Sequence, residues 1–255
     1  MLRVLTPARA LGAASLLGLL AAWTILVRLG VYRFAYLPDP LASVQVGLGF
    51  VTSWRFATNI SYSAYRVWTA WALACLIATP LGLLLGWKRT AALVGFPALE
   101  VLRPIPPIAW IPAAILFFPG VEPSVIFICF VGAFFPVLLG AKQGVEQIEP
   151  QYFQAARCLG AGPWRIFVDV VVPGALPSIF TGFAIGMGIA WMAVVAAEMI
   201  AGEFGLGYMI WDAYALARYP LIVVGMVIIA VIGSMSSAAI RWVAGRYLRW
   251  AGNKG

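Results

Sequence analysis

The stretch QAARCLGAGPWRIFVDVVVPGALP, Gln154 to Pro177, lies between two long apolar runs but is itself mixed in polarity. A run of helix-forming residues, Gln154 to Leu159, meets Gly160, which can adopt the left-handed conformation that ends a helix. Two prolines, Pro173 and Pro177, then lead into apolar sequence. A compact charged loop of this kind predicts a structured surface that contacts something in water.

The composition around this loop is that of a membrane protein. Of 255 residues, 63% are hydrophobic and 10% are charged, whereas about a quarter of a soluble domain is charged. The absence of histidine removes the usual general base, proton relay and metal ligand. Three cysteines stand far apart and are interpreted as small buried hydrophobes rather than as a disulfide or metal set.

Uncharged runs give the expected spans, since a helix needs about 20 residues to cross a bilayer core. The sequence predicts an all-α, polytopic transmembrane helical bundle of six spans, with both termini on one side. A cleaved signal is the alternative for the first run. The runs are Ala10–Val27, Val67–Trp87, a third rooted near Phe96 that continues through Pro104–Val121, Pro123–Ala141, Val170–Ala197 and Tyr219–Ile240.

The basic residues orient these spans. With the N-terminus inside, the cytoplasmic segments hold eleven Lys and Arg residues. The external segments hold five, which are Arg28, Arg33, Arg55, Arg66 and Arg218. Topology and contact with anionic membrane lipids therefore account for most of the net charge of +8, and no nucleic-acid partner is expected. We divide the chain into an N-terminal tail with the first helix, residues 1–35, and a core, residues 36–255, whose cytoplasmic loop is residues 146–173.

Four prolines interrupt the third run, within LRPIPPIAWIP. Proline removes a backbone donor and forces the preceding residue out of the helical region. Broken backbone is tolerated inside a membrane where it lines protein or a water-filled cavity. The pattern predicts a bent, pathway-lining segment near the cytoplasmic gate, with a simple kink as the alternative. Arg103 beside it is either a gate or pathway charge or an interfacial anchor.

Three further regions leave alternatives open. Glu198, the most deeply placed acid, either lines a pathway, pairs with an arginine, or is hydrated at the outer interface. A helix over Leu41–Phe56, capped by Asp39, either packs along the bundle as a tether or contacts a partner. The glycine-rich segment Ala201–Pro220 either re-enters the bundle as an outer gate or docks a partner. Trp191 is a candidate for lining the cavity. Gly182, Gly186 and Gly188 of the fifth run are small residues that let helices approach closely.

The loop resembles the EAA motif of type I ABC importer permeases, which reads E-A-A, three residues, G, nine residues, then I-x-L-P. Gln154-Ala155-Ala156 is followed after three residues by Gly160, and nine more lead to Val170-Val171-Val172-Pro173. Gln154 replaces the first Glu, which keeps the length and the hydrogen bonding of the side chain but loses its charge. LRPIPPIAWIP, FFPVLLGAKQGV, LPSIFTGFAIGMGIAW and VAAEMIAGEFGLGYMIWDA are similar to the nitrate/sulfonate/taurine/bicarbonate branch, and the resemblance runs from about Leu37 to Trp242.

The resemblance implies a non-catalytic permease of the bacterial inner (plasma) membrane that carries no cofactor of its own. Its implied partners are a second permease copy, as a homodimer, two cytoplasmic ATPase subunits that bind ATP and Mg, and an extracytoplasmic substrate-binding protein. The implied substrate is a small oxyanion or sulfonate such as nitrate, bicarbonate or taurine. The implied ATPase-coupling residues are Gln154, Ala155, Ala156, Arg157, Leu159, Gly160 and Pro173. The candidate pathway or gate residues are Arg103, Pro104, Pro106, Pro107, Trp191 and Glu198.

An ion-coupled secondary transporter or channel is the alternative function. It would need coupling acids or half-helix ion sites in mid-span, and only Glu198 and Glu100 come near. The sequence has no P-loop, no catalytic triad candidate and no metal-ligand cluster. The residues themselves therefore favour a chain that takes its energy from another subunit.

Overall fold

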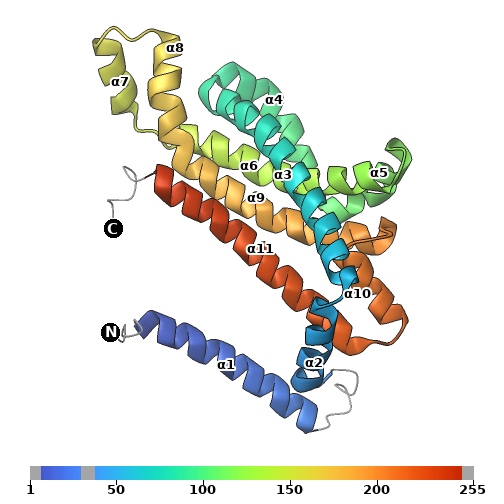
Figure 1. The fold of residues 1–255 in the computed structure, drawn as a ribbon. Helices are drawn as coiled ribbons and strands as arrows, with labels where there is room; N and C mark the ends of the chain where they lie inside the picture. The colour runs from blue at the N-terminus through green and yellow to red at the C-terminus, as the bar shows by residue number, and fades with distance from the viewer. Residues whose placement is uncertain (1–6, 30–37, 249–255) are drawn as a thin grey trace.

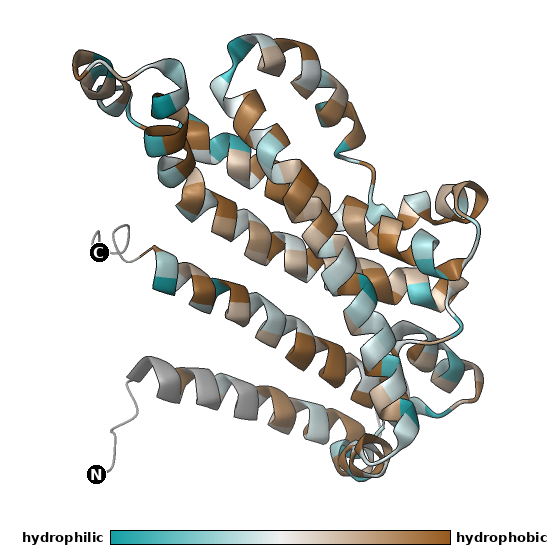
Figure 2. Ribbon diagram, turned by 45° about the horizontal axis from the view of Figure 1, so that its top comes forward, coloured by the Kyte–Doolittle hydropathy of each residue, from teal (hydrophilic) through white to brown (hydrophobic). Residues whose placement is uncertain are grey.

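The structure is a bundle of helices, which confirms the predicted all-α class (Figure 1). The computed structural model describes residues 7–29 and 38–248, and no strand occurs among them. Hydrophobic residues run along the length of the long helices, and hydrophilic residues are more frequent at the helix ends and in the connections (Figure 2). This distribution is expected of helices whose middle portions face lipid or one another.

Four helices are each long and apolar enough to cross a membrane: α3 (Trp54–Trp87), α6 (Val121–Glu146), the continuous helix Pro163–Ala201 and α11 (Tyr219–Tyr247). Two further pieces, Arg89–Leu102 and Pro107–Phe117, are bent by 86° and make a fifth candidate span if they are counted as one broken helix. Helix α1 (Pro7–Arg28) has 22 residues and is long enough for a sixth. The described helices are therefore compatible with six spans.

The bend confirms that the proline-rich third run is broken. Helix α4 (Arg89–Leu102) ends before the prolines, and a short 3₁₀ helix (Pro107–Trp110) and α5 (Ile111–Phe117) follow. Two other predicted boundaries are wrong. Helix α3 begins at Trp54 rather than at Val67, and α2 (Pro40–Val51) ends five residues before the expected Phe56.

Helix α2 ends early because Ser53 starts the next helix, its Oγ accepting from the backbone N–H of Phe56 at 3.4 Å. At the other end of α2, Asp39 Oδ1 accepts from the backbone N–H of Leu41 at 3.0 Å, as predicted. The turn residue Leu37 lies outside the described residues. Helix α2 packs on α11 and α3, which agrees with the tether alternative.

Helix α6 lies between α3 and α9 (Val172–Ala201) and touches both through glycine. A methyl group on Gly82 of α3 would lie 2.4 Å from the carbonyl oxygen of Leu138 in α6. One on Gly182 of α9 would lie 2.8 Å from the carbonyl oxygen of Pro136. Backbones this close require glycine, so the predicted close approach through Gly182 is confirmed. Gly188, also expected to serve this purpose, has open space around it.

The short helices occupy the two ends of the bundle (Figure 1). Helices α7 (Pro150–Cys158) and α8 (Pro163–Ile166) lie beyond the last turn of α6, at the end where α1 begins and α11 finishes. Helices α2, α5 and α10 (Leu206–Ala215) lie at the opposite end. Helix α10 packs on α9, α11 and α3, so the segment after α9 re-enters the bundle.

Candidate functional site

The α7–α8 loop, residues 150–166, has a fixed shape. Pro150 stands in the first turn of α7, where its missing N–H costs nothing. At the other end Gly160 has φ +76°, the predicted left-handed cap. Its N–H donates to the carbonyl of Arg157 at 2.9 Å, and that of Ala161 donates to the carbonyl of Ala156 at 3.0 Å. This pair of bonds is a Schellman motif, so the turn between α7 and α8 is closed by its own backbone.

The outer face of the loop is exposed and partly apolar. Leu159 is 87% exposed, Trp164 74% and Tyr152 54%. Phe153 on the opposite side packs against a buried cluster that includes Val145, Val171 and Ala175. Gln154, Ala155 and Arg157 are exposed and Ala156 is half-buried. The predicted ATPase-coupling residues of α7 therefore lie together on a surface that the rest of the described chain does not cover.

Aromatic stacking attaches the loop to the bundle. Phe167 stacks on Trp87, the last residue of α3, with ring centroids 4.4 Å apart, and Trp164 lies 5.8 Å from Phe167. The Nζ of Lys88 lies 5.5 Å from the ring centre of Trp87. The ring contacts link α8, through Phe167 of the segment that follows it, to the end of α3.

A π-helical segment, Phe167–Val171, joins α8 to α9. The backbone N–H of Val172 donates to the carbonyl of Phe167, five residues back. The widened turn stands immediately before Pro173, whose ring would otherwise clash with the preceding turn of an α-helix. Pro173 lies in the first turn of α9, directly after the π-helical segment.

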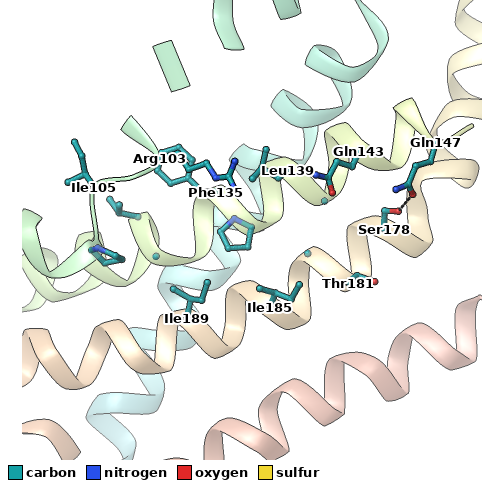
Figure 3. A pocket seen from close by; sticks show the side chains of 16 residues that line it. Arg103, Ile105, Phe135, Leu139, Gln143, Gln147, Ser178, Thr181, Ile185 and Ile189 are labelled. Carbon is teal, nitrogen blue, oxygen red and sulfur yellow. Dashed lines mark hydrogen bonds between the residues drawn. The ribbon is translucent and has the colours of Figure 1, made fainter. Parts of the chain in front are cut away.

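A cavity of about 550 Å³ lies between α6, α9 and the bend after α4 (Figure 3). Arg103, Ile105 and Pro107 line it from the bend. Pro104 and Pro106 belong to the bend but are exposed and do not line the cavity. The polar residues of the facing helices are Gln143 and Gln147 of α6 and Ser178 and Thr181 of α9.

Trp191 and Glu198 do not line this cavity. Trp191 is 2% exposed and belongs to the main core, where one side of it borders a groove between α9 and α11. Glu198 is fully buried near the end of α9. Of the predicted pathway residues, Arg103 and Pro107 therefore line the same cavity, whereas Trp191 and Glu198 lie elsewhere.

Glu198 belongs to a polar cluster, the Arg66 cluster, made of Ser63, Arg66, Glu122 and Glu198, of which Glu122 is half-buried and the other three are buried. The Nη1 of Arg66 donates to Glu198 Oε1 at 2.8 Å and to the carbonyl of Phe204 at 2.7 Å. Its Nε donates to Glu122 Oε2 at 2.8 Å, and its Nη2 also donates to Glu122. Glu198 therefore pairs with an arginine, which is one of the predicted alternatives. The alternative in which Glu198 is hydrated at the outer interface is wrong.

The turn after α9 completes the cluster. Ser63 Oγ donates to the carboxylate of Glu198 at 2.8 Å and accepts from the N–H of Leu206 at 2.9 Å. The N–H of Gly207 donates to Glu198 Oε2 at 2.9 Å. Gly205 has φ +121°, and a methyl group there would lie 2.3 Å from the carboxyl carbon of Glu198. Every polar atom of the Glu198 side chain is therefore occupied, as a buried carboxylate requires.

From the sequence we placed Arg66 in the external segments and did not predict this cluster. A signal was available. Ser63 and Arg66 stand three residues apart and so share a helix face, and Glu198 precedes glycines at 202, 205 and 207.

The cysteines differ in their surroundings. Cys129 is buried as expected and Cys75 is half-buried, but Cys158 at the end of α7 is exposed, so the burial predicted for it is wrong. Among the described residues, no group of three or more His, Cys, Asp or Glu side chains is arranged to hold a metal ion.

A membrane bundle with a cavity beside a broken helix, and with an exposed loop attached to two of its helices, has the parts of the membrane subunit of a transporter. The family described as "Binding-protein-dependent transport system inner membrane component" matches residues 78–249. The chain belongs to this family. It is accordingly a multi-pass membrane permease, the non-catalytic component of an ABC transporter.

The chain is similar to permeases of several named systems. An ABC transporter permease protein of Methanocaldococcus jannaschii is 41% identical over 203 residues, 79% of this chain and 76% of the relative. The bicarbonate transport system permease protein of Synechococcus elongatus is 31% identical over 252 residues, 92% of this chain and 88% of the relative. Relatives named as nitrate, aliphatic sulfonate and taurine permeases also match, which confirms the resemblance to this branch.

A solved structure has the same fold. An inward-facing conformation of the MetNI methionine ABC transporter aligns with a TM-score of 0.63 at 18% identity, over 77% of this chain and 95% of that one. The predicted type I ABC importer permease fold is confirmed.

Proposed function

We propose that this chain is the permease subunit of an ATP-driven importer for a small oxyanion or sulfonate. Two copies form the membrane part, two cytoplasmic ATPase subunits bind ATP and Mg, and an external binding protein delivers the substrate. The observation that carries the proposal is α7, an exposed helix with a rigid cap at the spacing of the EAA motif.

The α7–α8 loop is the proposed contact with the ATPase subunits. Leu159 and Tyr152 present apolar surface beyond the end of the spans, where water rather than lipid would meet it. Small side chains at Ala155 and Ala156 allow a partner to approach closely. The stacked Trp87 and Phe167 pass movement of the loop to α3, and the continuous helix passes it to α9.

The proposed orientation puts α7 and both termini in the cytoplasm. It rests on the distribution of Lys and Arg and on the position of α7 at the same end as the start of α1 and the finish of α11. The external end then carries α2 and α10, which the binding protein would meet first.

Two observations support an anion as substrate. The chain resembles permeases named for bicarbonate, nitrate and sulfonates. The cavity is lined by one arginine and no acidic residue. Glu198, on which an ion-coupled mechanism would depend, is fully bonded to Arg66, Ser63 and Gly207, so it offers no open coupling site.

Reconstitution tests the proposal. The purified chain is placed in vesicles with and without its ATPase subunits, and uptake of radiolabelled nitrate, bicarbonate and taurine is measured with the binding protein outside. Uptake is expected only with the ATPase subunits and ATP. Uptake driven by an ion gradient in their absence would contradict the proposal.

Two loop variants test the proposed contact. Ala155→Asp puts a charge on the docking face, and Gly160→Pro breaks the cap. Both are expected to abolish co-purification with the ATPase subunits while the bundle stays folded. Ala215→Asp, an exposed alanine at the end of α10, is the matched control and should co-purify normally. Normal co-purification of all three would contradict the assignment of the loop.

A further inference from the structure

Arg103 lies beside the middle of α6 rather than at either end of the bundle, and about half of its side chain is exposed. Arg103 directly follows α4, a helix of 14 residues. It therefore lies roughly 20 Å along the helix axis from Lys88 and Arg89 at the start of α4. Figure 3 shows it beside Phe135 and Leu139, which stand near the middle of α6. A charge at this level is costly unless it faces a water-filled cavity or a partner, and it marks a functional site by default.

The partners of Arg103 leave most of its donors free. A guanidinium has five N–H donors. Among the described residues its one recorded partner is Glu100, at 3.6 Å and one turn back on the same helix, and both side chains are about half exposed. A charge-assisted hydrogen bond is normally 2.7–2.9 Å long, so this exposed pair is weak and can be displaced by a better anion.

The rest of the wall also presents donors. Gln143 and Gln147 stand four residues apart on one face of α6. Ser178 Oγ donates to Gln147 Oε1 at 3.1 Å, which occupies the amide oxygen and leaves the amide NH₂ to donate elsewhere (Figure 3). No Asp or Glu is among the lining residues. The cavity thus offers one positive charge and neutral donors that continue from Arg103 toward the α7 end.

We infer that Arg103 binds the transported anion in this cavity, that it favours a monoanion over a dianion, and that Gln143 and Gln147 contact the anion on its way toward the α7 end. A monoanion and one guanidinium form a neutral pair inside the membrane, whereas a dianion leaves a net negative charge there. The planar fork of the guanidinium suits a carboxylate-like or sulfonate-like group in two-bond geometry. This inference rests on the proposed function.

Uptake by the reconstituted complex of permease, ATPase subunits and binding protein is the first test. Arg103→Gln is expected to lower ATP-dependent uptake of the anion that the wild type carries by about tenfold or more. Arg103→Lys should keep most of it. ATP hydrolysis stimulated by the loaded binding protein should stay within about twofold in both. Arg89→Gln, the same change at the exposed start of the same helix, is the matched control. Wild-type uptake by Arg103→Gln would overturn the inference and leave the proposed function standing.

Anion binding without the binding protein is the second test. Line broadening of ¹⁵N-nitrate is measured on the permease–ATPase complex in detergent. The wild type should broaden the signal and Arg103→Gln should not. Bicarbonate should displace nitrate, and sulfate at the same concentration should not. Displacement by sulfate as effective as that by bicarbonate would overturn the preference for monoanions. If the wild type shows no ATP-dependent uptake of any anion, the proposed function fails, and this measurement still decides whether the cavity binds anions.

A lipid phosphate could also pair with an exposed arginine, so the uptake test is repeated in vesicles of phosphatidylcholine alone. The effect of Arg103→Gln should persist there. An effect seen only when anionic lipid is present would make Arg103 a lipid anchor and overturn the inference.

Discussion

The Arg66 cluster and the α7–α8 loop use polar and apolar side chains in opposite ways at opposite ends of the bundle. In the cluster, Arg66 and Glu198 are buried, and every acceptor of Glu198 is bonded within the chain. In the loop, apolar side chains such as that of Leu159 are exposed.

This difference separates stability from binding. Removing a buried charge leaves its partners without bonds inside a low-dielectric interior, so the folded state suffers. Removing an exposed apolar group leaves the folded chain as it was, so only a partner can register the loss. The following predictions test this distinction, from the largest expected effect on stability to the smallest.

The largest effect is expected from Arg66→Ala. It leaves Glu198 buried without its cation, and should lower the free energy of unfolding by about 3–5 kcal/mol. Glu100→Ala breaks the exposed pair with Arg103 and should change the free energy of unfolding by less than about 1 kcal/mol. Thermal unfolding in detergent measures both. Equal changes would show that burial does not distinguish the two ion pairs.

A series of glycine variants should give graded effects. Gly205→Ala adds a methyl group against Glu198 at positive φ and should cost roughly 2–3 kcal/mol. Gly160→Ala meets open space at φ +76°, so only backbone strain remains, about 1 kcal/mol. Gly162→Ala has negative φ and open space, and should be neutral or slightly stabilising. Any other order in unfolding measurements would be inconsistent with the backbone geometry.

The aromatic attachment of the loop should give a smaller effect. Trp87→Ala removes the stack with Phe167 and should cost about 1 kcal/mol. Amide hydrogen exchange should also become faster in α8, because its contact with α3 is lost. Trp242→Ala, at a tryptophan that is 67% exposed on α11, serves as control. Unchanged exchange in α8 would mean that the stack does not hold the loop.

The smallest effect on stability is expected from Leu159→Ala. With 87% of this side chain exposed, the free energy of unfolding should change by no more than about 0.5 kcal/mol. If the loop docks on the ATPase subunits as proposed, their affinity should nevertheless fall about tenfold. Titration of labelled ATPase subunits against the permease measures this, and an unchanged affinity would place the contact elsewhere.

Local features were predictable from sequence because local chemistry determines them. The cap at Gly160, the capping by Asp39 and the break after Leu102 each depend on a glycine, a side-chain acceptor or prolines at known positions. The motif spacing in the loop was likewise readable, although what the loop contacts is still a proposal.

The start of α3 and the Arg66 cluster could not be read in the same way. We took Arg66 as the membrane edge because a lone charge ends an apolar run. The structure buries this arginine because Glu198, 132 residues away, neutralises it. A hydropathy pattern cannot reveal a partner so distant in sequence, and the turn that shields Glu198 is held by hydrogen bonds to Asn59 and Ser63 of α3.

The glycine contacts of α6 also limit how the bundle can move. Methyl groups on Gly86 and Gly144 would lie 2.8 Å from the carbonyl oxygens of Lys142 and Ala175, so the backbones of α3 and α9 already touch that of α6 at these positions. Sliding these helices along one another, or rotating one about its axis, would break close-packed backbone contacts. These three helices should therefore turn as one rigid body, and a small displacement of the loop at one end would be carried undiminished to the other.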